Sequence, residues 1–481
     1  MHKSVYRKDM VDCVLCLSAP CSEACPYMDV GSILRSVWFD DEKGAKLQLT
    51  HDCSSCSAPC EKACIKSVPI KRVMEKVKGV QVPEMDLSDE KLLESDICGI
   101  KIENPFLLSS SVVGSTYDMC ARAFDAGWAG VAFKTLSLMD IHEASPRFSA
   151  IKGDTGSIVG FKNIEQLSDH SLEENLDIFR RLKENYPSKF LLASIMGRDE
   201  EEWEYLSRKV TEAGADAIEL NFSCPNMVED GTGSDIGQSP KVVELFTKAA
   251  RRGTNLPILS KLTPNVGVMS PAAEASIRGG ADGIAAINTI KSIIEIEPGS
   301  GKVAVGGFSG NAVRPIAMRF ISELAQNKAV DGKHISAMGG IETWKDALAF
   351  ILLGAKSIQI TTAVMQYGYR IIDDLKKGLL IFMKERGVTM DDIVGGMIKK
   401  VVDVEEVERD IIVYPKFLRE KCIGCGRCVI SCMDGGHQAI KFTEDRKPIL
   451  DGKKCVGCHL CILVCPEEAI VSSGKVVRKP Q

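Results

Sequence analysis

Short apolar segments alternate with amphipathic segments over about 280 residues of the chain, starting near residue 97. The apolar runs have the length of buried strands, and the segments between them have apolar residues at helical spacing. Eight such strand–helix units predict an α/β fold, a (β/α)8 TIM barrel with parallel strands inside a ring of helices. The predicted strands are residues 105–111, 130–135, 190–196, 217–223, 258–263, 283–289, 335–340 and 357–362, and the predicted helices include 117–127, 172–185, 201–214, 241–252, 312–326 and 343–353.

Helical patterns also flank the predicted barrel, at residues 30–48 and 367–386. A chain of 481 residues is too long for one ordinary core, so we expect several domains. The predicted organisation is an N-terminal domain over residues 1–85, a barrel over 86–390, a connector over 391–415 and a C-terminal domain over 416–481.

Composition excludes several classes of partner. Apolar residues make up 45% of the chain and charged residues 26%, which is typical of a globular protein in water. The formal net charge of −5 does not indicate binding to nucleic acid or to an anionic membrane. No apolar run approaches the roughly 18 residues of a membrane span, and the N-terminus lacks the apolar core of a signal peptide. We therefore expect a cytoplasmic protein.

Cysteine is concentrated in four groups. The chain has 19 cysteines, and sixteen of them fall into four quartets, leaving only Cys98, Cys120 and Cys224. In a long chain without export signals, such groups indicate metal binding instead of disulfides. The last two quartets, Cys422-x2-Cys425-x2-Cys428-x3-Cys432 and Cys455-x2-Cys458-x2-Cys461-x3-Cys465-Pro, have the spacing of bacterial two-cluster ferredoxins. The first two are Cys13-x2-Cys16-x4-Cys21-x3-Cys25-Pro and Cys53-x2-Cys56-x3-Cys60-x3-Cys64.

These spacings predict four [4Fe–4S] clusters, two in each terminal domain. Zinc sites also use Cys-x2-Cys pairs, but here the third and fourth cysteines follow too closely for a zinc ribbon. By analogy with two-cluster ferredoxins, the fourth cysteine of each quartet should ligate the neighbouring cluster. The four predicted ligand sets are then Cys13, Cys16, Cys21 and Cys64; Cys25, Cys53, Cys56 and Cys60; Cys422, Cys425, Cys428 and Cys465; and Cys432, Cys455, Cys458 and Cys461.

A polar sequence with a thiol follows the fourth predicted strand. Asn221-Phe-Ser-Cys-Pro-Asn226 comes directly after an apolar run, and a Gly-rich stretch over 227–238 with the composition of an active-site loop follows it. Free cysteines are usually buried structural residues. At the C-terminal end of a barrel strand, however, Cys224 is placed to act as a general acid, base or nucleophile.

Other polar residues also fall at predicted strand ends, where a barrel has its active site. Gly-rich turns at residues 305–310 and 337–340, together with the Thr pair at 361–362, predict a phosphate site made by backbone N–H groups. With Lys134 and Lys261 nearby, this site suits flavin mononucleotide (FMN). No G-x-G-x-x-G turn occurs between a predicted strand and helix, so we expect no dinucleotide-binding domain.

Several short sequences of the chain are specific when taken together. They are Asn104-Pro-Phe, Phe133-Lys-Thr, Ala144-Ser-Pro-Arg147, Gly160-Phe-Lys-Asn-Ile-Glu165, Ala193-Ser-Ile-Met196, Asn221-Phe-Ser-Cys-Pro225, Ile287-Asn-Thr289 and the ferredoxin quartets. On these sequences, residues 97–470 resemble the pyrimidine-reducing subunit of NAD-dependent dihydropyrimidine dehydrogenase. The quartets near the N-terminus resemble the helical iron–sulfur domain of the same family, although the second is more closely spaced.

The resemblance implies interconversion of uracil or thymine with the 5,6-dihydropyrimidine, with hydride transfer through FMN and Cys224 as general acid. It also implies that the pyrimidine is held by Asn163, Asn221, Ser223, Asn288 and Thr289. The candidate FMN ligands are Ser110, Lys134, Thr135, Lys261, Gly307, Gly339, Gly340, Thr361 and Thr362.

Electrons would have to come from a partner, because the family's FAD and nicotinamide domains have no counterpart here. A separate flavoprotein subunit using FAD and NAD(P)H is expected, with a ferredoxin as the alternative, in a homodimer or a larger hetero-oligomer. Two other functions stay open. Asn226 follows Cys-Pro as in dihydroorotate dehydrogenases, which keeps dihydroorotate oxidation possible. A non-catalytic electron-transfer subunit with the barrel as a scaffold is the third reading.

Overall fold

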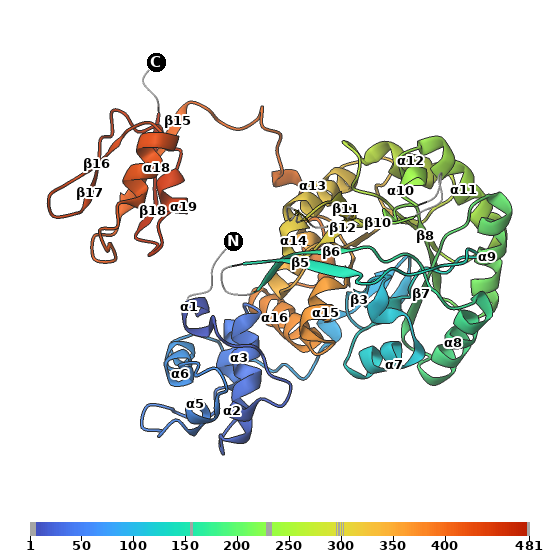
Figure 1. Ribbon diagram of the computed structural model, residues 1–481, viewed down its shortest axis with the longest axis horizontal. Helices are drawn as coiled ribbons and strands as arrows, with labels where there is room; N and C mark the ends of the chain where they lie inside the picture. Colours follow the sequence, from blue (N-terminus) through green and yellow to red (C-terminus); the bar gives the residue numbers. More distant parts are fainter. Residues whose placement is uncertain are drawn as a thin grey trace. The chain divides into compact units, whose positions relative to one another are not determined.

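The computed structural model describes residues 6–153, 157–227, 233–294, 296, 299, 301 and 303–478 (Figure 1). The chain divides into two compact units, the first ending at Lys400 and the second beginning at Val401. The first unit combines the predicted N-terminal domain with the predicted barrel, and the proposed boundary at residue 85 lies in a stretch without helix or strand.

The centre of the first unit is a closed ring of eight strands, which confirms the predicted TIM barrel. All strands of the ring are parallel to their neighbours, and each coincides with one of the eight predicted runs. Their apolar side chains are almost all fully buried, as expected for parallel strands covered by helices. In sequence order the ring strands are β3 (Phe106–Leu108), β4 (Gly130–Ala132), β7 (Phe190–Ile195), β8 (Ala217–Asn221), β9 (Ile258–Lys261), β10 (Gly283–Ala286), β13 (His334–Ala337) and β14 (Ser357–Ile360).

Helices surround the ring, and several of them begin at a side-chain cap. The Ser171 hydroxyl accepts from the backbone of Glu174 at the start of α8, and Thr343 and Asp346 form the same box at α14. A helix over residues 270–278 was not among the predicted ones, because its small residues give a weak amphipathic pattern. The helices are α7 (Tyr117–Asp125), α8 (Leu172–Asn185), α9 (Glu200–Glu212), α10 (Ser234–Gly237), α11 (Pro240–Gly253), α12 (Ser270–Arg278), α13 (Arg314–Ala325), α14 (Trp344–Leu352), α15 (Thr362–Tyr367), α16 (Ile371–Arg386) and α17 (Met390–Ile393).

Two smaller sheets accompany the barrel. The hairpin of β1 (Ser95–Ile97) and β2 (Ile100–Ile102) packs its isoleucines against the apolar interior of the ring. A separate antiparallel sheet has the order β11–β12–β6–β5 and was not predicted. Its strands are β5 (Phe148–Lys152), β6 (Ile158–Asn163), β11 (Ile290–Ser292) and β12 (Gly306–Ser309).

The N-terminal part is helical and has its own apolar core. The predicted helix over residues 30–48 is broken in two, because Asp40 adopts a left-handed conformation (φ 60°) and Asp41 caps the next helix by accepting from Gly44 N. The helices here are α1 (Arg7–Met10), α2 (Pro20–Glu23), α3 (Val30–Trp38), α4 (Glu42–Gln48), α5 (Pro59–Ala63) and α6 (Ile70–Lys78).

The N-terminal helices pack on the last helices of the barrel. Arg35 Nε donates to Asp374 Oδ2 at 2.7 Å, and the Ser36 hydroxyl donates to Asp374 Oδ1 at 3.0 Å. The indole of Trp344 donates to the Asp40 carbonyl at 3.0 Å. The predicted helix over 367–386 corresponds to α16, which is separated from α15 by Gly368 at a φ of 83°. This interface joins the two parts through charged and aromatic side chains.

The second unit begins its first strand, β15 (Ile411–Phe417), inside the predicted connector, because these residues pair with the end of the chain in β18 (Ile470–Arg478). Its remaining elements are α18 (Arg427–Gly435), β16 (Ile440–Phe442), β17 (Pro448–Leu450) and α19 (Leu460–Leu463). Among the described residues of both units, no helix has the length and apolar character needed to span a membrane.

Candidate active site and cysteine clusters

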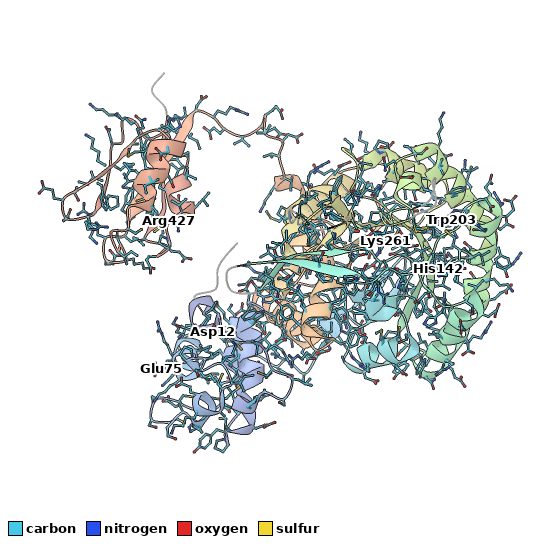
Figure 2. All side chains as sticks on the ribbon, in the orientation of Figure 1. Asp12, Glu75, His142, Trp203, Lys261 and Arg427 are labelled. Carbon is cyan, nitrogen blue, oxygen red and sulfur yellow. The ribbon has the colours of Figure 1, made fainter. Side chains whose placement is uncertain are left out.

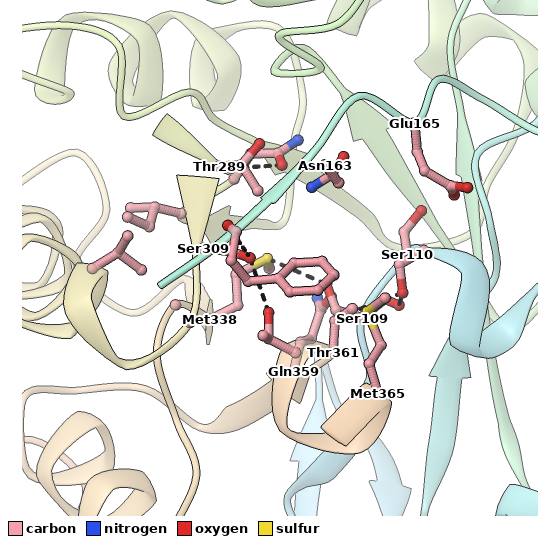
Figure 3. Close-up of a pocket in the computed structure, with 18 of the residues that line it drawn as sticks. Ser109, Ser110, Asn163, Glu165, Thr289, Ser309, Met338, Gln359, Thr361 and Met365 are labelled. Atoms are coloured by element: carbon pink, nitrogen blue, oxygen red, sulfur yellow. Dashed lines mark hydrogen bonds between the residues drawn. The ribbon is translucent and has the colours of Figure 1, made fainter. Parts of the chain in front are cut away.

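A cavity lies at the C-terminal ends of the barrel strands (Figure 3). The strand ends form one wall, and the sheet β11–β12–β6–β5 contributes another through Phe148, Phe161 and Phe308. Residues at or directly after the ends of seven of the ring strands, those other than β7, line it, including Lys134, Asn221, Lys261 and Asn288. Lys261, labelled in Figure 2, ends β9 and is 3% exposed. This is the end of the barrel at which the sequence predicts the site.

Cys224 lines this cavity directly after β8 and is 7% exposed. Burial raises the pKa of its thiol to about 11, which outweighs the opposing effect of a hydrogen bond from the Asn226 backbone. The thiol is therefore protonated at neutral pH and able to donate a proton. Residues 228–232 of the predicted active-site loop lie outside the described residues.

A row of hydrogen-bonded polar side chains lies along one wall of the cavity. The amide of Asn221 donates to Thr135 Oγ1 at 2.9 Å, and Asn221 Oδ1 accepts from the Ser223 hydroxyl at 2.8 Å. The amide of Asn288 in turn donates to Ser223 Oγ at 2.8 Å. The Thr135 hydroxyl also lies 3.0 Å from that of Ser110. These bonds fix the two amide side chains on neighbouring parts of the wall.

A second group of amides connects Asn163, at the end of β6, with Asn226, which follows β8. Asn226 Nδ2 donates to the Glu165 carbonyl at 2.7 Å and to Asn163 Oδ1 at 3.2 Å. Asn163 Nδ2 donates to the Gly307 carbonyl at 3.3 Å, which ties Asn163 to β12. Asn226 thereby holds the segment that carries both Asn163 and Glu165 against the strand end that carries Cys224.

The buried charges of the site are balanced internally. Lys134 Nζ lies 3.4 Å from Glu143 Oε1 and 3.3 Å from Glu165 Oε2. Glu165 Oε1 also pairs with Arg147 at 2.7 Å. Deeper in the barrel, Lys261 Nζ lies 3.3 Å from the wholly buried Glu219. Each predicted flavin-binding lysine therefore already has a carboxylate partner, which the sequence did not indicate.

The side chain of Gln359 adds an unsatisfied acceptor. Its amide donates to Glu219 Oε2 and to Ser336 Oγ, both at 3.1 Å, which fixes the orientation of the amide. Its Oε1 is buried and has no hydrogen-bond partner among the described residues. Gln359 lines the cavity, so this oxygen is available to a donor on a bound group.

The residues of the predicted phosphate site lie at the glycine-rich end of the cavity. Gly310, Gly339 and Gly340 line it with φ values of 86°, 120° and 76°, a conformation that favours glycine. Thr361 and Thr362 lie beside them at the start of α15, and the Thr362 hydroxyl is 3.0 Å from that of Ser309.

Most of the predicted site residues come together in this cavity. Ser223 and Gly307 do not line it: Ser223 lies behind Asn221 and Asn288, and Gly307 packs against Thr289, where a Cβ would approach Thr289 Oγ1 to 2.3 Å. Sequence reasoning did not assign Glu165, Gln359 or Phe161, which also line it. Of these, Phe161 and Glu165 carried a signal, because both belong to the matched Gly-Phe-Lys-Asn-Ile-Glu motif.

The cysteines group as the crossed assignment expects. In the N-terminal part, Cys13, Cys16, Cys21 and Cys64 line one cavity together with Arg35 and Arg370. The thiols of Cys25, Cys53, Cys56 and Cys60 form a second group. Burial, with smaller contributions from the neighbouring Cys25 and Cys53, raises the pKa of Cys60 to about 11. Burial likewise raises the pKa of Cys53, with further increases from Cys56 and Cys25.

In the second unit, one cavity is lined by Cys422, Cys425, Cys428 and Cys465, and another by Cys432, Cys455, Cys458 and Cys461. Within the described part of the chain, no three His, Cys, Asp or Glu side chains converge as they would around a single metal ion. The thiols instead surround spaces between them, an arrangement that fits a multi-atom cluster.

Comparison with known proteins agrees with this architecture. Residues 92–383 match the family described as dihydroorotate dehydrogenase, and residues 417–472 match the 4Fe-4S dicluster domain. The chain is 52% identical over 364 residues to the NAD-dependent dihydropyrimidine dehydrogenase subunit PreA of Escherichia coli K12, covering 74% of this chain and 88% of that protein.

More distant relatives include both dihydropyrimidine dehydrogenases and dihydroorotate dehydrogenases. The chloroplastic dihydropyrimidine dehydrogenase (NADP(+)) of Arabidopsis thaliana is 36% identical, covering 66% of this chain and 78% of the relative. The catalytic subunit of dihydroorotate dehydrogenase B of Pyrococcus horikoshii is 38% identical, covering 64% and 99%. A crystal structure of dihydroorotate dehydrogenase from Eimeria tenella, in complex with ferulenol, covers 65% of this chain and 90% of its own with a TM-score of 0.55; at 19% identity, it shows the shared fold alone.

The extent of these matches exceeds what a shared fold produces, because more than half of the chain matches one family and most of a relative's length aligns at 52% identity. The chain therefore belongs to the dihydroorotate dehydrogenase family of oxidoreductases, in the branch of the dihydropyrimidine dehydrogenase subunit PreA, and carries a 4Fe-4S dicluster domain at its C-terminal end.

Proposed function

We propose that this protein interconverts uracil or thymine with the 5,6-dihydropyrimidine, as an iron–sulfur flavoenzyme that receives its electrons from a partner. The observation that carries the proposal is the protonated thiol of Cys224 in a cavity lined by the amides of Asn163, Asn221 and Asn288. Reduction of the C5=C6 bond adds one hydride and one proton, and a buried acid beside an amide-lined wall supplies the second of these.

FMN fits the donors and acceptors of the cavity. Gly310, Gly339 and Gly340 leave backbone N–H groups and space for a phosphate, and Thr361 and Thr362 add hydroxyls. Lys261 would place a positive charge against the ring, and the unpartnered Gln359 Oε1 would accept from a ring N–H. Bound FMN would supply hydride transfer.

The protein's own residues would bind the pyrimidine and move its proton. Amide side chains donate and accept at once, as the alternating N–H and C=O groups of a uracil edge require. Ser223 would position Asn221 and Asn288 without touching the substrate. During reduction, Cys224 would give the proton of its Sγ to one carbon of the double bond while the hydride reaches the other. The thiolate then regains a proton from solvent.

The charge of the site favours a neutral pyrimidine over orotate. An orotate carboxylate needs an available cation, but Lys134 lies between Glu143 and Glu165, and Arg147 pairs with Glu165. The net charge of these four side chains is zero, so adding an anion would leave it uncompensated in a largely buried site. Dihydroorotate is therefore the second candidate substrate, after the neutral pyrimidines.

The four cysteine groups would hold four [4Fe–4S] clusters, which supply single-electron transfer. The similarity to a named subunit of an NAD-dependent enzyme supports a separate flavoprotein as the electron donor. The ligands would be the sets predicted from crossed ferredoxin spacing, since each set surrounds one space or groups its thiols together.

The test uses protein purified without oxygen, reduced chemically, and mixed separately with uracil, thymine and orotate. Return of the oxidised flavin absorbance with uracil or thymine, and not with orotate, would support the proposal. Reoxidation by orotate alone would assign the protein to dihydroorotate chemistry instead. A Cys224→Ala variant should keep its flavin and lose reoxidation by pyrimidines. The matched control is Cys120→Ala, at a buried cysteine of α7 outside the cavity. Normal turnover of Cys224→Ala would refute the assigned proton donor.

A further inference from the structure

The space among Cys13, Cys16, Cys21 and Cys64 is lined in part by the barrel. Arg370, the residue before α16, reaches from the barrel into the lining of this space. Its guanidinium donates to the Leu15 carbonyl at 2.6 Å and to the Cys16 carbonyl at 3.4 Å. Leu15 and Cys16 belong to the first cysteine quartet, so a barrel side chain is bonded to the loop that carries two predicted cluster ligands.

Arg370 and its neighbour Arg35 differ in whether a carboxylate pairs with their positive charge. Both line the same space, but Arg35 pairs at 2.7 Å with Asp374, whose side chain is fully buried. Among the described residues, Arg370 has no carboxylate partner, and its hydrogen bonds go to the carbonyls of Leu15, Cys16 and Tyr367. Arg370 therefore contributes an uncompensated positive charge to this space, and Arg35 does not.

One short helix connects this arginine to the active-site cavity. Thr361, Thr362 and Met365, at the start of α15, line the cavity at the strand ends. The helix has six residues, a rise of about 9 Å, and Arg370 follows three residues after its end. At the same end, the ring of Tyr367 contacts that of Phe39 in the N-terminal part with centroids 5.1 Å apart. The two cavities are thus neighbours across α15.

The second N-terminal cysteine group lacks such a connection. Lys71, which belongs to the N-terminal part itself, donates from Nζ to the Cys56 carbonyl at 3.2 Å. Within the described ranges, the hydrogen bonds from barrel side chains to backbone groups of N-terminal cysteines reach Cys16 alone. The two groups therefore differ in their relation to the barrel.

On the basis of the clusters in the proposed function, we propose that Arg370 raises the reduction potential of the cluster held by Cys13, Cys16, Cys21 and Cys64. Reduction adds one negative charge to a cluster, so an adjacent uncompensated cation stabilises the reduced form. Arg370 is thus a positioning and tuning residue, acting through the cluster and not on the pyrimidine.

The test is a potentiometric titration of the full-length protein, prepared without oxygen and followed by electron paramagnetic resonance. Arg370→Gln should move one iron–sulfur transition to lower potential and leave the others unmoved. Arg370→Lys keeps the charge and should show a smaller shift. The matched control, Lys71→Gln, removes a cation that donates to Cys56 and should move a different transition. A Cys16→Ser variant identifies the affected transition, because that signal should be lost or altered in it.

If Arg370→Gln leaves every transition at its original potential, or moves the one that Lys71→Gln moves, the inference about Arg370 is overturned while the clusters stand. If the wild-type protein shows no iron–sulfur transition that Cys16→Ser alters, both the inference and the proposed N-terminal cluster fail. A shift confined to the transition that Cys16→Ser alters supports the proposal.

Discussion

The side-chain amide of Asn288 donates a hydrogen bond to the hydroxyl oxygen of Ser223 at 2.8 Å. The Ser223 hydroxyl in turn donates a hydrogen bond to Asn221 Oδ1, so it links two amides on the cavity wall. Backbone N–H groups hold the same two oxygens, because Asn221 Oδ1 accepts from Ser223 N at 3.2 Å and Asn288 Oδ1 accepts from Thr289 N at 2.7 Å. The hydroxyl and these backbone groups together set the pattern of donors and acceptors on this wall.

Replacing Ser223 by alanine should lower kcat/KM for uracil by about tenfold, the effect of one lost hydrogen bond of about 1.4 kcal/mol. Steady-state rates over a range of uracil concentrations measure it. The control is Ser207→Ala, since the Ser207 hydroxyl is buried outside the cavity with no hydrogen-bond partner among the described residues. Equal kcat/KM in Ser223→Ala and wild type would show that the amides keep their orientation unaided.

The pH dependence should differ between the two directions of the reaction. Burial raises the pKa of Cys224 to about 11, so the thiol is protonated throughout the neutral range. For pyrimidine reduction, Cys224 must be protonated, and kcat/KM should not fall through this group until the pH approaches about 11. For dihydropyrimidine oxidation, the thiolate is needed, and kcat/KM should rise about tenfold per pH unit below that pKa. Initial rates in both directions test this, and a fall in reduction near neutral pH that is absent from Cys224→Ser would contradict it.

Glu165→Gln should weaken the preference for uracil over orotate. The change removes one carboxylate from Lys134 and Arg147, which leaves a positive charge available to the orotate carboxylate. We expect the ratio of orotate to uracil affinity to rise by about tenfold, the equivalent of 1.4 kcal/mol. Titration of the oxidised enzyme with each pyrimidine, followed by the flavin spectrum, measures both affinities. An unchanged ratio would mean that Glu165 does not set the charge selectivity.

Asp41→Asn should stabilise the protein at high pH. Burial raises the pKa of Asp41 to about 7, well above that of an unfolded aspartate. The carboxyl group therefore favours the fold while protonated; this contribution is complete below about pH 3.9 and is lost as the pH rises through about 7. Asparagine caps α4 equally well and carries no charge. The variant should gain up to about 4 kcal/mol at pH 8 and much less near pH 5, as measured by thermal denaturation of the two proteins. A gain of the same size at both values would exclude titration of Asp41 as its cause.

The sequence predicted the ring of eight strands because each parallel strand is buried on both faces and reads as a continuous apolar run. It did not predict the sheet of β5, β6, β11 and β12. These strands mix exposed and buried residues, and β6 pairs with β12 more than 140 residues later in the chain. A local pattern carries no information about such a partner.

The same limit applies to individual site residues. Cys224 and Asn221 were predicted as site residues because Asn221 ends a strand and Cys224 closely follows it, and the apolar pattern gives the position of that strand. Glu143 and Glu165 lie in loops, and their pairing with Lys134 depends on how those loops return to the barrel. Gly307 was assigned to the flavin from its glycine-rich sequence, whereas its missing side chain accommodates Thr289.

The cavity has a floor and a roof that come from different sheets, and the antiparallel sheet forms the roof. The floor, with Cys224, Asn221 and Lys261, is made by strands of the ring and cannot change without disturbing the barrel. The roof, with Phe161, Asn163 and Phe308, is made by insertions between ring strands, whose loss or replacement leaves the ring closed. The segments above the cavity can therefore be exchanged during evolution while the strand end that carries Cys224 is kept.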